Sequence, residues 1–436
     1  MQYQIPKGVF DILPQDPDPK GGWRQVDRWQ HVEAVIRATA GHYGYQEIRT
    51  PVFERTELFQ RSVGEGSDIV SKEMYTFEDR GERSMTLRPE GTAPVMRAFL
   101  EKKLYALAPI HKFYYIEPMF RYERQQAGRY RQHHQFGVEA IGHSAPEQDV
   151  EVIDLLYTLL GRLGLKGLSL LINSLGDAAC RHVYRQRLWN YLTPLRNQLS
   201  SDSQARFDGN PLRILDSKAP EDQEIIAEAP LLTEILDEAS RDHFAAVCKG
   251  LTQLRIPFTL APRLVRGLDY YNRTVFEMTA GELGAQNSVG GGGRYDGLLQ
   301  TLGGPDLPAC GFGSGIERIL QTMLGQGLAF PGPMRPALYL IPLGDAAKAS
   351  CFALLTSLRR SGISAEMELG GKKLKAAMSM ADKAQALYTS VVGDEELKKG
   401  IFTLKEMASG KTQELSAEQF LEQFRTIIHG LYSSSR

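Results

Sequence analysis

The sequence predicts an α+β protein with two folded units: a large one built on a sheet of hairpins, and a smaller α/β unit at the C-terminal end. Residues 113–122 and 133–142 are aromatic and β-branched runs on either side of a polar, glycine-containing stretch, which is the pattern of a long hairpin. Residues 177–250 are charged and helix-forming, which indicates a helical insertion between sheet-forming halves. Beyond residue 336, strand-like and helix-like runs alternate, as in a small α/β domain with a parallel or mixed sheet.

Length and composition bound the function classes. A chain of 436 residues with 42% apolar and 24% charged residues is typical of a globular protein with more than one core. A net charge of −1 excludes a basic surface over the whole molecule, so any nucleic-acid surface must be local. The N-terminus lacks the apolar run of a signal peptide, and no stretch of about 18 apolar residues is present, so we expect a cytoplasmic protein without a membrane segment.

The cysteines argue against a structural metal. They are far apart and form no C-x-x-C pair, which disfavours zinc and a disulfide framework and favours a reducing compartment. We therefore predict no metal ligands in the protein itself. The four cysteines are Cys180, Cys248, Cys310 and Cys351.

The elements follow in order along the chain. Residues 23–43 form a predicted amphipathic helix, with Trp29 and Ile36 among the apolar residues at helical spacing. Residues 45–53 read as a strand broken by Pro51. Further strands are predicted at residues 258–260, 274–278, 337–343, 364–369 and 387–392.

A stretch rich in glycine and proline separates the two predicted units. Residues 326–336 have the composition of a linker, so the large unit is predicted at residues 1–325 and the small one at residues 337–436.

The first candidate site is the segment 86–92 (TLRPEGT). Pro89 cannot continue a central strand, and Gly91 permits a sharp turn. Thr92 is expected to cap a helix that begins around Pro94. The turn would present Glu90 and Thr92 at the end of a strand, where they can hold a small cation. An ordinary strand-to-helix connection with a solvated glutamate is the alternative.

The second candidate is the predicted hairpin and its tip. The planar guanidinium group grips phosphate oxygens at two places at once, so arginines gathered here indicate either a phosphate ligand or a surface hairpin with solvated charges. On a strand, Gln135, Gly137 and Glu139 share one face, and the glycine would leave an open floor for a flat ligand. The arginines near the tip are Arg121, Arg124, Arg129 and Arg131.

Two later segments also carry polar groups beside glycines. Residues 264–271 (LVRGLDYY) place Arg266, Asp269, Tyr270 and Tyr271 close together, a set that can read a polar aromatic substrate or simply pack in a loop. In residues 309–318 (ACGFGSGIER), a smooth glycine strand leads into a helix whose Arg318 can reach back over it to a purine or a phosphate. Residues 290–293 are four consecutive glycines, which allow close approach of a ligand.

In this order, these segments resemble the class II aminoacyl-tRNA synthetases, and among them the histidyl-tRNA synthetases. The similarity covers nearly the whole chain, and residues 266–277 (RGLDYYNRTVFE) resemble the segment specific for histidine. The other matching segments are 7–14 (KGVFDILP), 86–92, 119–124 (MFRYER), 311–318, 370–373 (GGKK) and 381–383 (ADK).

The resemblance implies a fold and a reaction. The fold is an α+β catalytic domain with an antiparallel sheet of the class II type, a helical insertion and a C-terminal α/β anticodon-binding domain, in a homodimer. The reaction joins histidine and ATP, used with Mg²⁺ as co-substrate, into histidyl-adenylate and then transfers the histidyl group to the 3′ end of tRNA(His). The partners are thus histidine, ATP and tRNA(His), with no zinc and no editing domain.

The resemblance also assigns roles to single residues. Arg121, Arg266 and Arg318 would bind ATP and stabilise charge during catalysis. Gly290 and Ser314 depart from the family pattern, which usually has cysteine and a larger apolar residue there. Histidine would be held by Glu90, Thr92, Gln135, Glu139, Tyr270, Tyr271 and Tyr295, and the tRNA acceptor end by Arg124 and Gln126.

Two competing interpretations come from related folds. A synthetase-like regulatory subunit of ATP phosphoribosyltransferase would bind histidine without charging tRNA, but such proteins lack the anticodon-binding domain and an intact RGLDYY segment. A class II synthetase for another amino acid is disfavoured by residues 266–271.

Overall fold

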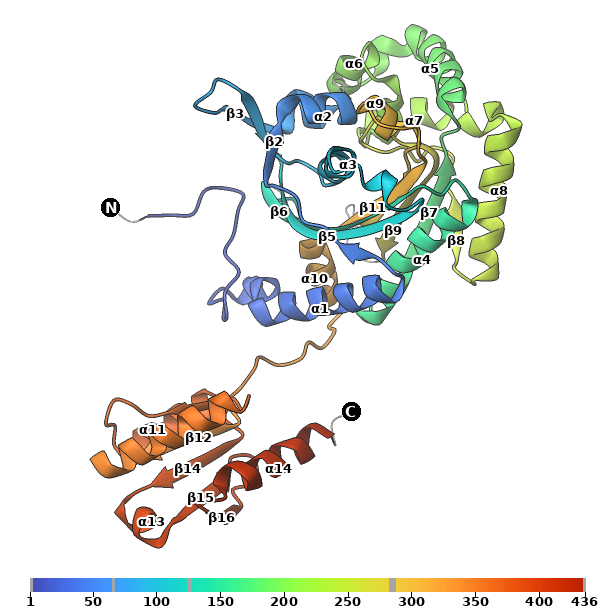
Figure 1. Cartoon of the computed structure of the whole chain (residues 1–436). Helices are drawn as coiled ribbons and strands as arrows, with labels where there is room; N and C mark the ends of the chain where they lie inside the picture. The colour runs from blue at the N-terminus through green and yellow to red at the C-terminus, as the bar shows by residue number, and fades with distance from the viewer. Residues whose placement is uncertain (1–2, 65–66, 124–127, 282–287, 434–436) are drawn as a thin grey trace. The chain divides into compact units, whose positions relative to one another are not determined.

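The computed structural model describes residues 3–64, 67–123, 128–281 and 288–433. The chain divides into two compact units, Met1–Pro331 and Gly332–Arg436. Each unit has its own sheet and its own apolar core (Figure 1). Within the described residues, no helix has the length and apolar character needed to cross a membrane.

An eight-stranded sheet forms the centre of the large unit. Its neighbouring strands are antiparallel except for the two outermost pairs, which are parallel. In spatial order the strands are β1 (Gln46–Glu47), β5 (His111–Phe120), β6 (Gln132–Ile141), β11 (Ala309–Gly315), β10 (Ser288–Arg294), β9 (Asn272–Ala280), β7 (Leu168–Ser174) and β8 (Phe258–Leu260).

The two faces of this sheet have different characters because side chains alternate along each strand. On β6, Phe136 and Val138 point into the larger apolar core, whereas Glu139 points to the opposite face. Helices α1 (Val26–His42), α4 (Pro146–Arg162) and α10 (Ile316–Gly325) cover the apolar face (Figure 1). The other face lies beneath α3 (Thr92–Glu101) and the inserted helices, and it carries the polar groups of the candidate site.

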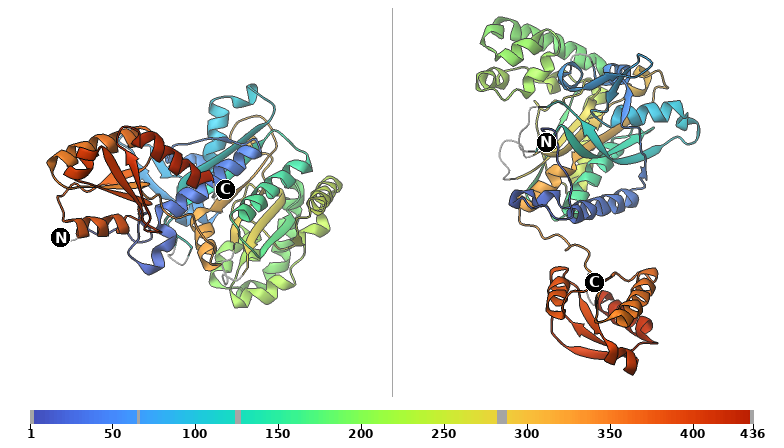
Figure 2. Two further views of the ribbon diagram at one scale, coloured as in Figure 1. Left: turned by 90° about the horizontal axis from the view of Figure 1, so that it is seen from below. Right: turned by 90° about the vertical axis from the view of Figure 1, so that its left-hand side faces the viewer.

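The predicted hairpin and insertion are both present. Strands β5 and β6 pair antiparallel, with Tyr115 opposite Gly137. Most of the insertion packs together beside the sheet (Figure 2), whereas its last helix, α8 (Glu238–Gln253), packs against α4. Its elements are α5 (Ala178–Leu192), η4 (Thr193–Gln198), α6 (Ser201–Phe207), η5 (Pro211–Asp216), α7 (Pro220–Ala227), η6 (Leu232–Ile235) and α8 (Glu238–Gln253).

The N-terminal segment differs in detail from the prediction. The predicted first helix is two elements, because Gln25 is extended and separates η1 (Pro19–Arg24) from α1. The strand predicted at residues 45–53 is also split: β1 joins the main sheet, and β2 joins a separate three-stranded sheet. That sheet consists of β2 (Phe53–Arg55), β4 (Ser84–Leu87) and β3 (Tyr75–Glu78). The helical elements of this part of the chain are α2 (Thr56–Val63), η2 (Ile69–Glu73) and η3 (Leu104–Ala106). The remaining short helix of the large unit is α9 (Leu298–Thr301).

The small unit has a mixed five-stranded sheet in the order β13-β12-β14-β15-β16. The three strands predicted from the sequence are parallel to one another, and two antiparallel strands, β15 and β16, extend the sheet. The elements are β12 (Leu338–Pro342), α11 (Asp345–Arg360), β13 (Ala365–Met367), α12 (Leu374–Lys383), β14 (Tyr388–Val392), α13 (Asp394–Lys399), β15 (Ile401–Glu406), β16 (Thr412–Ser416) and α14 (Phe420–Ser433).

Candidate active site

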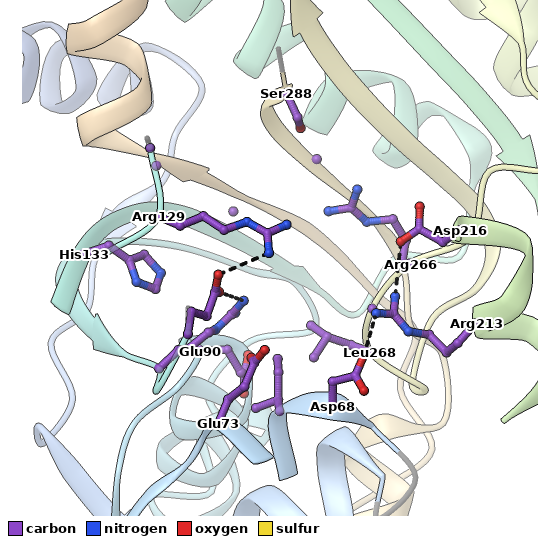
Figure 3. Close-up of a pocket in the computed structure, with 18 of the residues that line it drawn as sticks. Asp68, Glu73, Glu90, Arg129, His133, Arg213, Asp216, Arg266, Leu268 and Ser288 are labelled. Atoms are coloured by element: carbon purple, nitrogen blue, oxygen red, sulfur yellow. Dashed lines mark hydrogen bonds and ion pairs between the residues drawn. The ribbon is translucent and has the colours of Figure 1, made fainter. Parts of the chain in front are cut away.

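A polar cavity of about 1050 Å³ lies on the polar face of the large sheet. Its walls come from the hairpin, the α3 N-terminus, η2, the glycine strands β10 and β11, and the insertion. Arg129 and Arg266 point into it from opposite sides (Figure 3). The predicted site residues that line it are Glu90, Thr92, Arg121, Gln135, Arg266, Tyr270, Tyr271 and Arg318.

Glu90 is fixed at the N-terminus of α3. Its carboxylate accepts hydrogen bonds from the main-chain N–H groups of Thr92, at 2.7 Å, and Ala93, at 2.8 Å. Burial raises the pKa of Glu90, while these N–H groups oppose that rise. The capping role predicted for Thr92 was wrong. The helix begins at Thr92 rather than near Pro94, and the glutamate satisfies its first N–H groups.

Thr92 instead contacts Glu139, the centre of a buried hydrogen-bond cluster. The Thr92 hydroxyl donates to Glu139 Oε1 at 2.9 Å, and the Tyr115 hydroxyl donates to the same oxygen at 3.3 Å. The Tyr295 hydroxyl donates to Oε2. Burial raises the pKa of Glu139 to about 8, although the hydroxyl donors favour its ionised form. Glu139 and Tyr295 therefore lie directly behind the residues that line the cavity.

The tyrosines form one aromatic group beside this cluster. The ring centroids of Tyr270 and Tyr271 are 4.7 Å apart, and Tyr295 lies 5.4 Å and 6.0 Å from them. Asp269, which the sequence grouped with them as a substrate contact, points elsewhere and accepts a hydrogen bond from Asn210 of the insertion at 2.6 Å.

Each predicted arginine is anchored on one side. Arg121 donates from Nε to the carbonyl oxygen of Pro89 at 2.7 Å. Arg318, in the first turn of α10, donates to the carbonyl oxygens of Ser288 at 2.9 Å and Gly128 at 3.3 Å. Arg266 lies 3.6 Å from Glu277, and its buried Nε has no hydrogen-bond partner among the described residues.

The glycines make room for protein side chains as well as for a ligand. A Cβ atom at Gly137 would lie 2.2 Å from the Tyr115 ring, so the open floor predicted there is filled by that tyrosine. At Gly313 a Cβ would lie 1.6 Å from Gln135, and at Gly291 it would lie 2.8 Å from Arg266. These glycines therefore position polar side chains over the sheet.

Sequence reasoning missed several residues that line the cavity. His133 shares the face of Gln135, so period-two alternation was a signal that would have found it. Burial and the nearby charge of Arg121 lower the pKa of His133 to about 3. The insertion also contributes Arg206, Arg213 and Asp216, and nothing in the spacing of the sequence indicated this (Figure 3).

The hairpin tip is only partly described. Arg124 and Gln126, the predicted tRNA contacts, lie outside the described residues. Arg129 lines the cavity and lies 3.4 Å from Glu123. Arg131 is stacked on the ring of Tyr122, with its guanidinium carbon 4.0 Å from the ring centroid, and does not reach the cavity.

The two departures from the family pattern are neighbours in space. A Cβ at Gly290 would lie 3.2 Å from the Cβ of Ser314 and 3.0 Å from Leu156. The Ser314 hydroxyl donates to the carbonyl oxygen of Val289 at 2.6 Å. A small residue at one position therefore accompanies a small residue at the other, and both residues line the cavity.

Among the described residues, one cluster of potential metal ligands and one carboxylate in the cavity wall bear on cation binding. Asp177, Cys180 and Asp237 have ligand atoms within 4.8 Å of one another, away from the cavity. Their polar atoms already have structural roles, because both aspartates cap helices and the Cys180 thiol donates to Asp237. In the cavity wall, Glu317 receives two bonds from His134 on Oε1, and its buried Oε2 has no partner within the described part of the chain.

A largely antiparallel sheet that carries buried carboxylates and anchored arginines around one polar cavity, with a separate α/β unit, is the architecture of a class II aminoacyl-tRNA synthetase. The family described as "Histidyl-tRNA synthetase" matches residues 22–319, and the family described as "Anticodon binding domain" matches residues 337–427. The chain belongs to the histidyl-tRNA synthetase family.

Individual relatives agree with this assignment. The chain is 61% identical to the histidine–tRNA ligase of Protochlamydia amoebophila over 96% of this chain and 98% of that protein. It is 48% identical to that of Desulfitobacterium hafniense over 97% of each chain. The crystal structure of apo S. aureus histidyl-tRNA synthetase is similar, with a TM-score of 0.82 and 37% identity, covering 97% of this chain and all of that one. The regulatory-subunit alternative is not favoured.

Proposed function

We propose that the large unit activates histidine with ATP in the cavity described above and passes the histidyl group to the 3′ end of tRNA(His). Ligase activity on histidine, ATP and tRNA(His) follows from membership of the family. The assignment of roles to individual residues is our proposal. The observation that carries it is the convergence of Glu90, Arg121, Arg266 and Arg318 on one cavity directly in front of Glu139.

Histidine binds at the α3 end of the cavity. Glu90, Thr92 and Gln135 hold its α-ammonium group, for which the buried Glu90 carboxylate is the natural counter-charge. Tyr271 and Glu139 are the partners of the two imidazole nitrogens. In its ionised form the Glu139 carboxylate has about four lone-pair sites, of which three accept from hydroxyl donors, so one is left for the substrate. Tyr270 and Tyr295 pack beside the ring.

The arginines act on ATP. Attack of the histidine carboxylate on the α-phosphorus concentrates negative charge on the phosphoryl oxygens, and pyrophosphate leaves. Fixed cations aimed at those oxygens stabilise the transition state most. Arg121 and Arg266 take this position, and the Nε of Arg266, which has no hydrogen-bond partner among the described residues, supports that role. Arg318 holds the far end of ATP. No protein nucleophile takes part, so positioning and charge supply the rate.

Mg²⁺ enters with ATP and offsets the charge of the triphosphate. The cavity wall contains a group that fits a hard cation with oxygen ligands, because one carboxylate oxygen of Glu317 has no hydrogen-bond partner among the described residues. We assign Mg²⁺ to ATP and no zinc to the chain.

The remaining assignments concern the tRNA and the assembly. We place the catalytic domain at residues 1–325 with its insertion at about 177–250, the linker at 326–336, and the anticodon-binding domain at 337–436. Arg124 and Gln126 on the hairpin tip meet the acceptor end. The enzyme works as a cytoplasmic homodimer.

Pyrophosphate exchange with each of the twenty amino acids in turn tests the proposal. Histidine alone should support exchange at high rate, because a site that hydrogen-bonds its substrate rejects analogues lacking those groups by roughly 10⁴–10⁵. Exchange supported equally by another amino acid, or no exchange with histidine, would refute it.

A further inference from the structure

The insertion contacts the main chain of residues 269–271, which lie in the segment proposed to recognise histidine. Arg181, half-buried in the first turn of α5, donates from Nη1 to the carbonyl oxygens of Asp269, at 2.9 Å, and Tyr271, at 2.7 Å. These two carbonyls flank Tyr270. One guanidinium group of the insertion thus fixes the main chain that carries both tyrosines lining the cavity.

A second side chain of the insertion grips the same segment. Asn210, which is 6% exposed, donates to the Asp269 carboxylate at 2.6 Å. On the side of the catalytic core, the N–H group of Asp269 donates to the carbonyl oxygen of Val63 at 3.2 Å. Asp269 therefore joins the insertion to the core, and the position of the following tyrosines depends on both.

The insertion also reaches the opposite wall of the cavity. Arg206 and Arg213 lie 2.9 Å and 3.2 Å from the carboxylate of Asp68, which directly precedes η2 (Figure 3). Arg213 also borders Gly267, where a Cβ would lie 3.2 Å from its Nη1. The inserted helices consequently contact the cavity wall at both η2 and the 266–271 segment.

The hydrogen bonds of Arg181 are concentrated on one short segment of the main chain. Its Nε is buried without a hydrogen-bond partner in the described parts of the chain, so the group leaves one donor unsatisfied while serving two carbonyls. A buried donor left unpaired is unfavourable. Both hydrogen bonds that the Arg181 side chain makes among the described residues go to carbonyl oxygens of residues 269–271.

We propose that the insertion is a positioning element of the amino-acid site: Arg181 sets the main chain of residues 269–271, so that docking of the insertion and binding of histidine stabilise each other. This inference rests on the proposed role of Tyr271 as an imidazole partner. Because coupling between two sites is reciprocal, histidine must tighten the insertion as much as the insertion tightens the histidine site.

The kinetic test replaces Arg181 by methionine, which keeps most of the apolar stem and removes both donors. Arg181→Met should raise the KM for histidine in pyrophosphate exchange roughly ten- to a hundredfold, because two hydrogen bonds from a charged group are lost. The KM for ATP and the midpoint of thermal unfolding should stay close to wild type. Arg187→Met is the matched control, because Arg187 lies on the same helix and its side chain is half exposed. Its ion pair, at 3.4 Å, is with Glu234, which is equally exposed.

A double-mutant cycle tests whether Arg181 acts by positioning Tyr271 or by stabilising the large unit in general. If Arg181 acts through Tyr271, the effects of Arg181→Met and Tyr271→Phe on the histidine KM will be non-additive, and the double variant will resemble Tyr271→Phe alone. Asn210→Ala should raise the histidine KM by a smaller factor. It also keeps the test open if Arg181→Met fails to fold.

The reciprocal effect is visible without any substitution. Histidine added to the wild-type chain should slow amide hydrogen exchange in α5, residues 178–192, and should not do so in folded Arg181→Met.

An unchanged histidine KM in Arg181→Met and Asn210→Ala, with Tyr271→Phe impaired, would overturn this inference and leave the proposed function intact. Unaltered exchange in wild-type α5 would also overturn it. If Tyr271→Phe also bound histidine normally, the proposed imidazole site itself would fail.

Discussion

The two units of this chain bury polar side chains very differently. The large unit encloses complete ion pairs, such as Arg88 with Glu117 at 2.6 Å and Arg294 with Asp149 at 2.9 Å. In the described part of the small unit, the buried polar side chains are Glu368, Thr389 and Ser390. Burying charge is unfavourable unless each group is paired. A charged substrate that is enclosed by protein needs buried charged side chains around it, as in the large unit. A unit with a mainly apolar core, such as the small unit, can bind a long polar partner on its surface.

The largest expected effect comes from breaking one of these buried pairs. Arg294 is fully buried and also donates to the carbonyl oxygens of His143 and Ala145. Arg294→Ala should lower the free energy of unfolding by about 3–5 kcal/mol, because the buried Asp149 loses its arginine and keeps only His243 and Thr274 as partners. Arg359→Ala, at an exposed position of the small unit, removes one hydrogen bond to the carbonyl oxygen of Ala365 and should change it by about 1 kcal/mol or less.

Urea denaturation measures both changes. Tryptophan fluorescence reports the large unit alone, since all three tryptophans precede residue 190, and circular dichroism follows the whole chain. Equal losses in the two variants would erase the contrast between the units.

The next effect is catalytic and is confined to the large unit. Arg266→Ala should reduce histidine-dependent pyrophosphate exchange about 10²–10³-fold, as expected for removal of one transition-state donor. The KM for ATP should change much less, because Arg121 and Arg318 remain. Arg359→Ala serves as the control in the same assay. An unchanged exchange rate in Arg266→Ala would remove its proposed role.

A truncation separates the units directly. Residues 1–331 form a compact unit that contains the whole cavity, so this fragment should retain histidine-dependent exchange. Its charging of tRNA(His) should fall more than about tenfold, which corresponds to about 1.4 kcal/mol of lost tRNA binding. Full charging by the fragment, compared with the intact chain at equal concentration, would contradict the proposed role of the small unit.

The last prediction is a pH dependence of stability in the ligand-free protein, which is gradual from one pH unit to the next. The pKa of Glu139 is about 8 in the folded state, against about 4.3 in an unfolded chain. Between these values the folded state keeps a proton that the unfolded state releases, so the stability from this group falls as pH rises from about 4.3 to 8. Glu139→Gln should remove that decline, which amounts to at most about 1.4 kcal/mol per pH unit.

Unfolding midpoints measured at pH 5, 6, 7 and 8 for both proteins test this expectation. Parallel curves for Glu139→Gln and wild type would show that Glu139 does not hold the extra proton.

Much of the fold was predictable because its elements carry local signals. The hairpin of β5 and β6 was visible as two apolar runs, and the linker as a run of glycine and proline. The split of residues 45–53 between two sheets was not predictable, because it depends on pairing with distant strands. The antiparallel strands β15 and β16 were also missed, although they pair with each other and with β14 close by in the sequence.

The site residues that lie in recognisable sequence motifs were predictable. The residues that reach the site only through tertiary packing were not. Tyr115 and Arg181 carry no local pattern, yet one fills the space over Gly137 and the other holds residues 269–271. The helix-capping role of Glu90 instead of Thr92 depended on one side-chain rotamer, which spacing alone does not fix.

A crystal structure with a non-hydrolysable analogue of histidyl-adenylate tests the central claim most directly. We predict that the imidazole will contact Glu139 and Tyr271, the α-ammonium group Glu90, and the phosphate Arg121 and Arg266. An analogue bound elsewhere, or turned so that its imidazole faces Arg318, would contradict the account.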